Sequence, residues 1–318
     1  MTKDERETDD IDSLRPLLFS IAYRMLGSVA DAEDLVQETF LRYERARTDG
    51  VGIDSPKSYL TTVVTRLAID ELRSARTRRE TYPGQWLPEP LLTDREEPQP
   101  DEIADRADTI SMAFLVLLER LNPIERAVFL LHDVFGYGFA DIADIVGKSE
   151  VNCRQIAVRA RRYIDEGRSR FESSREKRDK LSARFFSAVT EGDVDRLIEM
   201  LATDVVVYGD GGGKSLQWSE PITGVERVAR LLANVGNQVR AVDGRLELRE
   251  VNGQPGALVL APDGGLISVF ALDIALGGVQ TVRSVINPDK IAHLGAVTDP
   301  RELLQERHRG GGRSASRR

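Results

Sequence analysis

The residues best suited to chemistry gather in the segment 139–162, where polar side chains alternate with the apolar residues of two short helices. Gly147 falls where the first helix must end in a left-handed conformation, which costs glycine less than any residue with a Cβ. Ser149 follows as the N-cap of the second helix. The pattern predicts a helix-turn-helix whose second helix faces DNA. The side chains that this helix would turn toward DNA are Ser149, Glu150, Asn152, Arg154, Gln155, Arg159, Arg161 and Arg162.

These side chains divide by chemistry. Arg154 and Gln155 are the candidates for base contacts, because arginine pairs with guanine and glutamine with adenine in the major groove. Arg159, Arg161 and Arg162 are expected to hold phosphates and to carry little sequence information. The alternative is an ordinary helical hairpin with solvated arginines. The upstream residues 122–125, Asn-Pro-Ile-Glu, favour the DNA-binding interpretation, because they are typical of a capped helix start and open a strongly apolar helix to Phe135.

Other reactive side chains give weaker signals. The segment Asp210-Gly-Gly-Gly-Lys214 allows close backbone approach, but its spacing differs from a dinucleotide-binding fingerprint. Asp210, Asp273 and Arg283 could line a pocket, although charges at strand ends are usually structural. The chain has three histidines, and the lone cysteine, Cys153, lies on an apolar helix face, which favours a buried thiol over a nucleophile. We therefore expect no enzymatic activity, no cofactor and no metal site.

Composition limits the class of protein. The 318 residues are 41% hydrophobic, and no apolar run approaches the roughly 20 residues that span a bilayer. The acidic first residues differ from a secretory signal, so we expect a cytoplasmic protein. The formal net charge of −8 disfavours tight DNA binding by the chain alone, but basic residues concentrate in 66–79 and 154–178. Such a chain is expected to need a larger partner that brings it to DNA.

Periodicity and turn residues divide the chain into blocks. Helical spacing covers 11–80, with a third helix starting at Pro56, and a second helical block covers 108–171. A proline-rich and acidic linker, 81–107, joins them and is expected to be extended. Helices and then antiparallel strands in 178–296 predict an α+β domain. The tail 297–318 is expected to be disordered. The predicted fold class is two all-α domains followed by an α+β domain.

Several motifs carry a family resemblance. The segments 31–40 (DAEDLVQETF), 55–60 (SPKSYL) and 66–73 (RLAIDELR), with the helix-turn-helix downstream, resemble regions 2 and 4 of an extracytoplasmic-function sigma factor of bacterial RNA polymerase. The last block resembles a SnoaL-like domain, a cone-shaped α+β fold. Sigma factors with this fusion have three further motifs that are present here, namely Trp86-Leu-Pro-Glu-Pro90, Asp210-Gly-Gly-Gly-Lys214 and Asn287-Pro-Asp-Lys290.

The resemblance implies core RNA polymerase and promoter DNA as partners. The residues it places against core polymerase are Asp31, Glu33, Asp34, Gln37 and Glu38. The loop 49–57 and the third helix would hold the unpaired downstream promoter element, with a basic track and pockets for flipped bases. The residues for this role are Lys57, Tyr59, Arg66 and Arg73. Tyr59 could equally be a core aromatic residue, and the acidic residues could belong to an ordinary solvated helix.

The resemblance also implies regulation in cis by the SnoaL-like domain, with Trp86 and Leu87 packing on it and setting the spacing of regions 2 and 4. The expected regulatory contacts are Trp86, Leu87, Pro88, Asp210, Gly211, Gly212, Gly213, Lys214, Asn287, Pro288, Asp289 and Lys290. We then expect no separate anti-sigma factor, and a small-molecule ligand of the C-terminal domain stays open. The alternatives are a ligand-responsive helix-turn-helix regulator that acts without core polymerase, and an enzyme of the SnoaL type.

Overall fold

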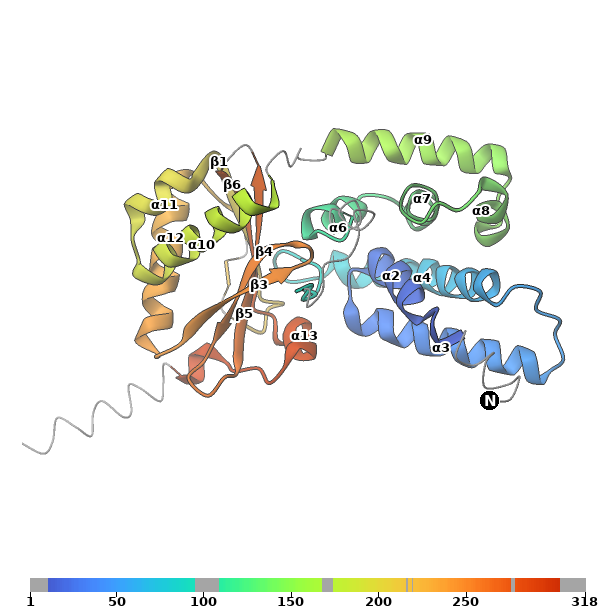
Figure 1. Ribbon diagram of the computed structural model, residues 1–318, viewed down its shortest axis with the longest axis horizontal. Helices are drawn as coiled ribbons and strands as arrows, with labels where there is room; N and C mark the ends of the chain where they lie inside the picture. Colours follow the sequence, from blue (N-terminus) through green and yellow to red (C-terminus); the bar gives the residue numbers. More distant parts are fainter. Residues whose placement is uncertain are drawn as a thin grey trace, which may run out of the picture. The chain divides into compact units, whose positions relative to one another are not determined.

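The computed structural model describes residues 11–94, 109–167, 174–215, 217–218, 220–275 and 278–303 (Figure 1). The chain forms two compact units. The first unit comprises residues 1–81 and 114–168, and the second comprises residues 82–113 and 169–318. The linker after the first helical block therefore belongs to the C-terminal unit. None of the described helices is long and apolar enough to cross a membrane.

Three helices begin the first unit: α2 (Arg15–Leu26), α3 (Val29–Thr48) and α4 (Pro56–Glu80). Gly27 ends α2 in the left-handed conformation, with φ of 67°. The Ser28 side chain then accepts a hydrogen bond from the Asp31 N–H and caps α3. The apolar stripes of the three helices pack together around Leu18, Val36 and Leu60, which are fully buried.

The second helical block contains α6 (Met112–Leu118), α7 (Pro123–Phe129), the π-helical turn η2 (Leu130–Val134), α8 (Phe139–Val146) and α9 (Glu150–Gly167). Asn122 and Glu125 form the expected capping box at the start of α7. The predicted helix to Phe135 is wrong in its last turn, because the chain widens into a π turn. Periodicity alone does not distinguish such a turn from α-helix, because Leu130 and Leu131 still face the core.

The two helical blocks pack against each other within the first unit, with α2 and α4 in contact with α7, η2 and α8. Arg126 lies at this contact with 3% of its surface exposed. Its Nη1 donates to Met25 O at 2.5 Å and to Glu119 Oε1 at 2.9 Å. Burial lowers the pKa of Arg126 to about 9. A buried cation with two specific acceptors holds the blocks in one register.

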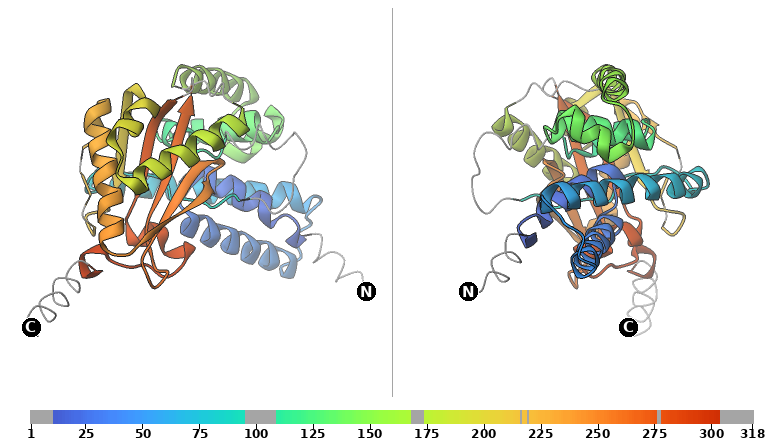
Figure 2. Two further views of the ribbon diagram at one scale, coloured as in Figure 1. Left: turned by 60° about the vertical axis from the view of Figure 1, so that its left-hand side comes forward. Right: turned by 90° about the vertical axis from the view of Figure 1, so that its right-hand side faces the viewer.

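The second unit contains a six-stranded sheet with helices on one face (Figures 1 and 2). Its helices and strands are α10 (Arg175–Glu191), α11 (Val194–Met200), β1 (Leu201–Asp210), β2 (Ile222–Thr223), α12 (Val225–Ala241), β3 (Arg245–Val251), β4 (Gln254–Leu260), β5 (Leu266–Ala275), β6 (Gly278–Val285), α13 (Pro288–Ile291) and the 3-10 turn η3 (Ala292–Leu294). Gly236 lets α12 approach α10, because a Cβ at this position would lie 1.7 Å from Val189 O.

The sheet order is β2-β1-β6-β5-β4-β3, and β1 pairs with β6 in parallel. The expectation of antiparallel strands throughout is therefore wrong for this pair. Strands joined by tight turns pair antiparallel, but β1 and β6 are separated by α12 and four strands, so no turn sets their direction. Alternation along β1 turns Val205 and Val207 to the helix-covered core and Asp210 to the opposite face.

The described part of the linker, residues 82–94, lies on the second unit without a helix, as expected for a proline-rich connector, and residues 95–108 lie outside the described residues. It runs beside β3, where Leu92 bridges Val251 and the Thr93 N–H donates to Glu250 O at 2.9 Å. The extended backbone left by proline can therefore pair with a sheet edge.

The predicted tail is wrong in its first residues. Val297 bridges Leu266, and the Thr298 N–H donates to Leu266 O at 2.9 Å. Leu303 packs against the apolar core of the sheet. Backbone groups at the start of β5 and the nearby apolar surface hold these first residues of the tail. The polar and glycine-rich composition of the later tail residues gives no sign of this contact. Residues 304–318 lie outside the described residues.

Candidate functional site

The helix-turn-helix is formed by α8 and α9 around a small apolar core. Gly147 adopts the expected left-handed conformation with φ of 66°, and Ser149 Oγ accepts from the Asn152 N–H at 3.3 Å. Ile142, Cys153 and Ile156 are buried between the helices. Burial also raises the pKa of the Cys153 thiol, so this cysteine is a packing residue and a poor nucleophile.

The opposite face of α9 is exposed, as predicted. Asn152 is the exception, because it is half-buried beside the N-cap. Three arginines make ion pairs within the first unit: Arg154 Nη2 lies 2.6 Å from Glu150 Oε2, Arg161 pairs with Asp133, and Arg162 Nε lies 3.8 Å from Glu166 Oε1. Such exposed pairs contribute little stability, so they can open when phosphates approach. The exposed face is Ser149, Glu150, Arg154, Gln155, Arg159, Arg161 and Arg162.

Two apolar side chains on the same face escaped the sequence analysis, which considered only polar ones. Val151 is 62% exposed and Val158 is 65% exposed. Apolar side chains at this place on a recognition helix can contact the C5-methyl group of thymine. The available signal was the period, because both valines fall out of phase with the buried positions Cys153, Ile156 and Ala160.

The loop 51–55 and α4 border a hollow of about 590 Å³, which we call the region 2 hollow. Tyr59 and Arg66 line it, whereas Lys57 and Arg73 are exposed on α4 outside the lining. Tyr59 is half-buried and meets Tyr43 edge-on, with 5.9 Å between ring centroids, so it is both a packing residue and a wall of the hollow. The structure thus brings together two of the four predicted residues.

Arg66 is also bound to the helix-turn-helix. Its Nε donates to Ile145 O at 2.9 Å and its Nη2 donates to Asp144 O at 2.7 Å. Both acceptors are carbonyls in the last turn of α8, where helix carbonyls lack partners within the helix and favour a cation. In this conformation two of the five donors of a predicted DNA-binding arginine are used inside the protein.

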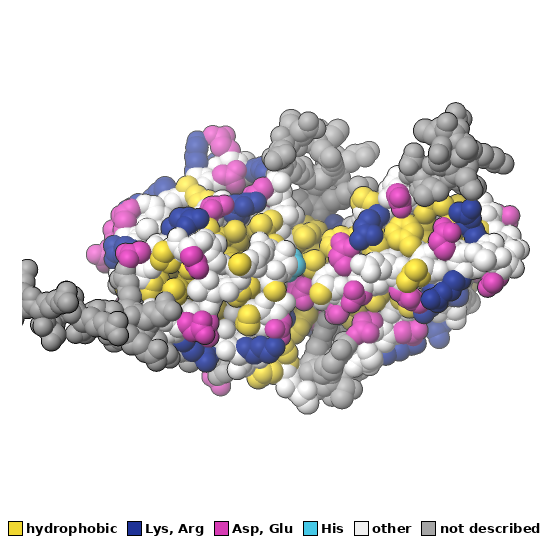
Figure 3. Space-filling model, turned by 90° about the horizontal axis from the view of Figure 1, so that it is seen from below, with side chains coloured by type: hydrophobic (Ala, Val, Ile, Leu, Met, Phe, Trp, Pro, Cys, Tyr) yellow, Lys and Arg dark blue, Asp and Glu magenta, His cyan; other side chains and the backbone are white. Residues whose placement is uncertain are grey.

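The acidic face of α3 is exposed, and two of its glutamates form ion pairs. Glu33 pairs with Arg15, and Glu38 Oε1 lies 2.7 Å from Arg42 Nε. Asp31, Asp34 and Gln37 are exposed on the same helix. Figure 3 shows acidic, basic and apolar side chains mixed on the side of the first unit where α3 lies. The sequence analysis missed Leu41, which is 53% exposed one turn after Gln37 and adds an apolar contact to this face.

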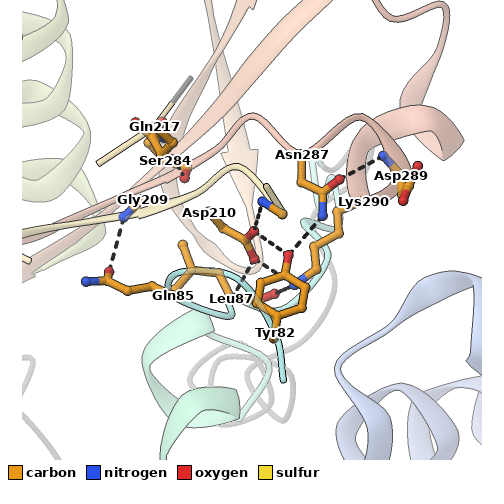
Figure 4. A network of polar contacts seen from close by, with 11 residues as sticks. Tyr82, Gln85, Leu87, Gly209, Asp210, Gln217, Ser284, Asn287, Asp289 and Lys290 are labelled. Atoms are coloured by element: carbon orange, nitrogen blue, oxygen red, sulfur yellow. Dashed lines mark hydrogen bonds and ion pairs between the residues drawn. The ribbon is translucent and has the colours of Figure 1, made fainter. Parts of the chain in front are cut away.

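Three motifs from distant parts of the chain meet around the Asp210 carboxylate in the second unit (Figure 4). Asp210 is fully buried at the end of β1. Its Oδ2 accepts from the Leu87 N–H at 2.8 Å and from Lys290 Nζ at 2.7 Å, and its Oδ1 accepts from the Tyr82 hydroxyl. We call this the linker-docking cluster, whose members are Tyr82, Trp86, Leu87, Asp210, Asn287 and Lys290.

Lys290 is enclosed by the linker. Its ammonium donates to Leu87 O, and it lies 4.8 Å from the ring centroid of Tyr82 and 4.3 Å from that of Trp86. The Lys290 side chain is 8% exposed. Aromatic faces carry negative charge and attract such a desolvated cation. Trp86 therefore contributes to docking through its ring, while the neighbouring Leu87 is 3% exposed and Pro88 is buried.

Tyr82 belongs to the cluster although the sequence analysis did not select it. Its hydroxyl donates to Asp210 and accepts from Asn287 Nδ2 at 2.9 Å. Burial and the Asp210 carboxylate raise the pKa of Tyr82, so this phenol stays protonated and remains a donor. A lone tyrosine before the tryptophan motif gave no distinctive spacing, so only its contacts identify it.

The glycines of 211–213 permit close approach, as expected. A Cβ at Gly212 would lie 2.2 Å from Asn287 Nδ2, and one at Gly213 would lie 2.8 Å from Pro83 Cγ. Gly211 is equally confined, because a Cβ would lie 2.7 Å from Ser215 O. The loop is thus shaped to let the linker and the Asn287 side chain pack against backbone.

An ion pair also joins the segments 210–214 and 287–290. Lys214 pairs with Asp289, and Asn287 caps α13 by accepting from the Asp289 N–H through Oδ1 at 3.1 Å. Pro288 is in the first turn of this helix. His293, which follows α13, lies with Nε2 2.8 Å from Pro90 O. Of the predicted regulatory residues, Asp210, Asn287 and Lys290 thus bind the linker directly, whereas Lys214 and Asp289 pair with each other.

The buried acids have structural partners. Asp210 is paired with Lys290, and Asp273 is paired with Arg283, with 8% exposure for each of these two side chains. Within the described residues, no group of three or more histidine, cysteine, aspartate or glutamate side chains could hold a metal ion. The carboxylates of Asp210 and Asp273 are therefore both engaged in ion pairs.

Known proteins show where this architecture belongs. The family described as Sigma-70 region 2 matches residues 11–78, and the family described as Sigma-70, region 4 matches residues 111–164. The ECF RNA polymerase sigma factor SigJ of Mycobacterium tuberculosis is 37% identical over 292 residues, which cover 89% of this chain and 93% of that protein. The probable ECF RNA polymerase sigma factor SigI of the same species is 33% identical over 287 residues, with coverage of 89% and 93%.

A solved structure resembles the whole chain. The crystal structure of M. tuberculosis extracytoplasmic function sigma factor SigJ superposes with a TM-score of 0.70 and 33% identity, over 90% of this chain and 98% of that one. Region 2 and region 4 thus correspond to the two helical blocks, and the sheet unit is the SnoaL-like domain. The chain belongs to the extracytoplasmic-function sigma factors of bacterial RNA polymerase, with a SnoaL-like domain fused at its C-terminal end.

Proposed function

We propose that the linker-docking cluster controls this sigma factor in cis. By holding residues 82–92 on the SnoaL-like domain, the cluster limits the length of chain that can separate region 2 from region 4. The observation that carries the proposal is the buried Lys290–Asp210 ion pair, which is completed by Tyr82 and Leu87 of the linker. The sigma factor function itself follows from the family.

The energetics of the linker-docking cluster are suitable for regulation. Removing two charges from water costs nearly as much as their attraction returns, so docking is close to balanced. Tethering raises the effective concentration of the linker at the domain, so weak contacts are sufficient. A change in a few contacts then shifts the docked fraction strongly. Control by linker docking within the chain makes a separate anti-sigma factor unnecessary. We place this control in the cytoplasm, where promoter DNA is.

We assign the DNA contacts to two places. Arg154 and Gln155 on α9 read bases of the upstream element, and Arg159, Arg161 and Arg162 hold its phosphates. The region 2 hollow takes an unpaired base of the downstream element, with Tyr59 for stacking. Lys57 and Arg73 follow the backbone of that strand. Arg66 can offer all its donors to that strand only after it leaves the carbonyls of Asp144 and Ile145.

We assign core polymerase binding to α3. The acidic side chains Asp31, Glu33, Asp34 and Glu38 are complementary to a basic surface, with Gln37 as an amide contact. The exposed Leu41 provides an apolar anchor beside them. A helix-turn-helix regulator that acts without polymerase would have no use for this face. An enzyme of the SnoaL type would need a free acid or base, whereas Asp210 and Asp273 are both paired.

The test is run-off transcription with purified core polymerase and the full chain. Lys290→Met and Trp86→Ala both weaken docking and are expected to change the run-off yield at least threefold, a rise meaning that docking inhibits and a fall that it activates. The matched control is Lys180→Met, because Lys180 pairs with Glu176 on the exposed surface of the same unit. Unchanged yields for both docking variants would refute the control in cis, while a lack of run-off product from the wild-type chain and from both docking variants would refute the promoter assignments.

A further inference from the structure

A cavity of about 450 Å³ lies in the second unit between α12 and the sheet. Val235 and Val239 on α12 form one wall, and Val259, Ile267 and Phe270 on the strands form the other. Its volume lies in the range of cavities that hold small molecules. It faces the helix-covered side of the sheet, opposite the linker-docking cluster, because Phe270 belongs to the core whereas Asp210 points away from it.

Amide and hydroxyl side chains line part of this cavity, and two further lining residues carry buried hydrogen-bond donors without acceptors. Trp218 Nε1 and Arg301 Nε are buried and have no hydrogen-bond partner among the described residues. Arg301 Nη2 donates to Lys214 O at 3.1 Å, and this guanidinium makes no ion pair with any described residue. No aspartate, glutamate or histidine occurs among the described residues that line the cavity. Buried donors that lack acceptors are rare, because each costs desolvation free energy.

We propose that this cavity binds an apolar small molecule that ends in a carboxylate. The carboxylate would accept hydrogen bonds from Arg301 and Trp218, and the apolar body would lie between the valines of α12 and Phe270. A carboxylate satisfies the guanidinium better than a hydroxyl, because charge-assisted hydrogen bonds are about twice as strong as neutral ones. Since the cavity has no acid or base among its described lining residues, it holds the ligand and does not convert it.

The rim of the cavity is built on a glycine. A Cβ at Gly209 would lie 2.6 Å from the side chain of Gln217 and 2.7 Å from Trp218 Nε1. Gln217 Nε2 in turn donates to Ser284 Oγ at 3.1 Å and so fixes the rim on β6. Gly209 therefore lets the segment with Trp218 lie against β1. The donor has a defined place and is not a side chain left loose at the surface.

The cavity and the linker-docking cluster share backbone. Gly209 at the rim precedes Asp210 of the cluster, and Asp210 O accepts from the N–H of both Ile286 and Asn287, at 2.9 and 3.0 Å. Ile286 lines the cavity, and Asn287 binds Tyr82 of the linker. Ligand binding would therefore act on linker docking through β1 and β6. This step rests on the proposed function of the cluster, whereas ligand binding itself does not.

The binding test uses isothermal titration calorimetry on the full chain, with decanoate and 2-naphthoate as an acyl and an aromatic acid. Decan-1-ol and 2-naphthol are the matched neutral probes. At least one acid is expected to bind at least tenfold more tightly than its alcohol. Arg301→Gln should remove this preference by weakening the acid and not the alcohol. Arg230→Gln is the control, because Arg230 lies on α12, is 71% exposed and does not line the cavity.

Two further measurements check that a loss of binding comes from the lost donor and not from unfolding. Circular dichroism checks that Arg301→Gln is folded, and Trp218→Phe, which keeps an aromatic ring and removes the N–H, should weaken the acid at least threefold. Equal affinity for acid and alcohol, the absence of heat with both acids, or an unchanged preference in both variants would overturn the proposed ligand class. Binding that differs between decanoate and 2-naphthoate identifies the shape of the apolar body.

Hydrogen–deuterium exchange tests the coupling. In the presence of the acid that binds, exchange at the backbone amides of residues 86–92 should change at least threefold, because Leu87 N–H is bound to Asp210. Unchanged exchange would disprove the coupling and leave the binding site standing. Neither experiment contains polymerase, so both results are independent of whether linker docking controls transcription.

Discussion

Lys290 places an ammonium group where water scarcely reaches, and its partners in the linker-docking cluster come from distant parts of the sequence. Asp210 is the counter-ion, Leu87 O is the second acceptor, and two aromatic rings cover the remaining sides. Such a group is stable only when the whole set is present, since an unpaired buried charge is far more costly than a paired one. The docked linker is therefore a cooperative unit.

This cooperativity predicts the outcome of a double-mutant cycle. Lys290→Met leaves the Asp210 carboxylate buried and unpaired, so the free energy of unfolding of the second unit should fall by about 3–5 kcal/mol. In the Lys290→Met variant, Asp210→Asn should lower the free energy of unfolding much less than it does in the wild-type chain, because the partner charge of Asp210 is already gone. Urea unfolding followed by tryptophan fluorescence measures this unit, because both tryptophans, Trp86 and Trp218, belong to it. Additive single effects would show that the ion pair is not coupled.

At the scale of the element, α9 presents two groups of side chains for the proposed DNA contacts. Its first turns present Arg154 and Gln155 together with the exposed Val151, and its later turns present arginines that pair with acids of the first unit. Arg154 is also held over the Phe139 ring at 5.4 Å, which limits its freedom before DNA arrives. A restrained base-reading side chain loses less entropy on binding.

This arrangement predicts two different kinds of loss. Arg154→Ala should lower discrimination at one or two upstream positions by about 1–3 kcal/mol each, because a bidentate base contact is lost. Arg162→Ala should weaken binding to all sequences by a similar factor, because a phosphate contact carries no sequence information. Run-off transcription from a set of single-base promoter variants with core polymerase separates the two. The distinction fails if both variants lower all promoters equally.

At the scale of the molecule, charge and domain arrangement explain why a DNA-binding protein carries a net charge of −8. The basic residues are gathered on α4 and α9, while the surface of α3 is acidic. In the first unit, Arg66 binds the last carbonyls of α8 and links region 2 to region 4. In the free chain, the positive charge of Arg66 is thus partly engaged by carbonyls of the protein and is less available to DNA phosphates.

The free chain should therefore bind promoter DNA weakly. Fluorescence anisotropy at physiological salt should show a Kd for the chain alone no tighter than about 10⁻⁶ M, with no preference over a scrambled duplex. Core polymerase should add at least a tenfold preference for the promoter, because it separates the two reading elements and neutralises the acidic face. Tight and specific binding without polymerase would instead support a stand-alone regulator.

Several features were predictable because they depend on neighbours in the sequence. Gly27 and Gly147 end helices, Ser28, Asn122 and Ser149 begin them, and apolar spacing identifies the buried faces of α3 and α9. The motif residues near Trp86, Asp210 and Asn287 were also recognisable from their order. Backbone preference and periodicity act over a few residues, so the chain alone determines them.

Only the tertiary structure decided how distant segments meet. The parallel pairing of β1 with β6, the Arg66 contact with α8, the packing of Val297 on β5 and the enclosure of Lys290 by Tyr82 and Trp86 all join residues far apart in the chain. Their free energy comes from burial and pairing in one three-dimensional arrangement, and no local pattern encodes the partner. For the same reason, the unpartnered donors of Trp218 and Arg301 became visible only once the cavity was formed.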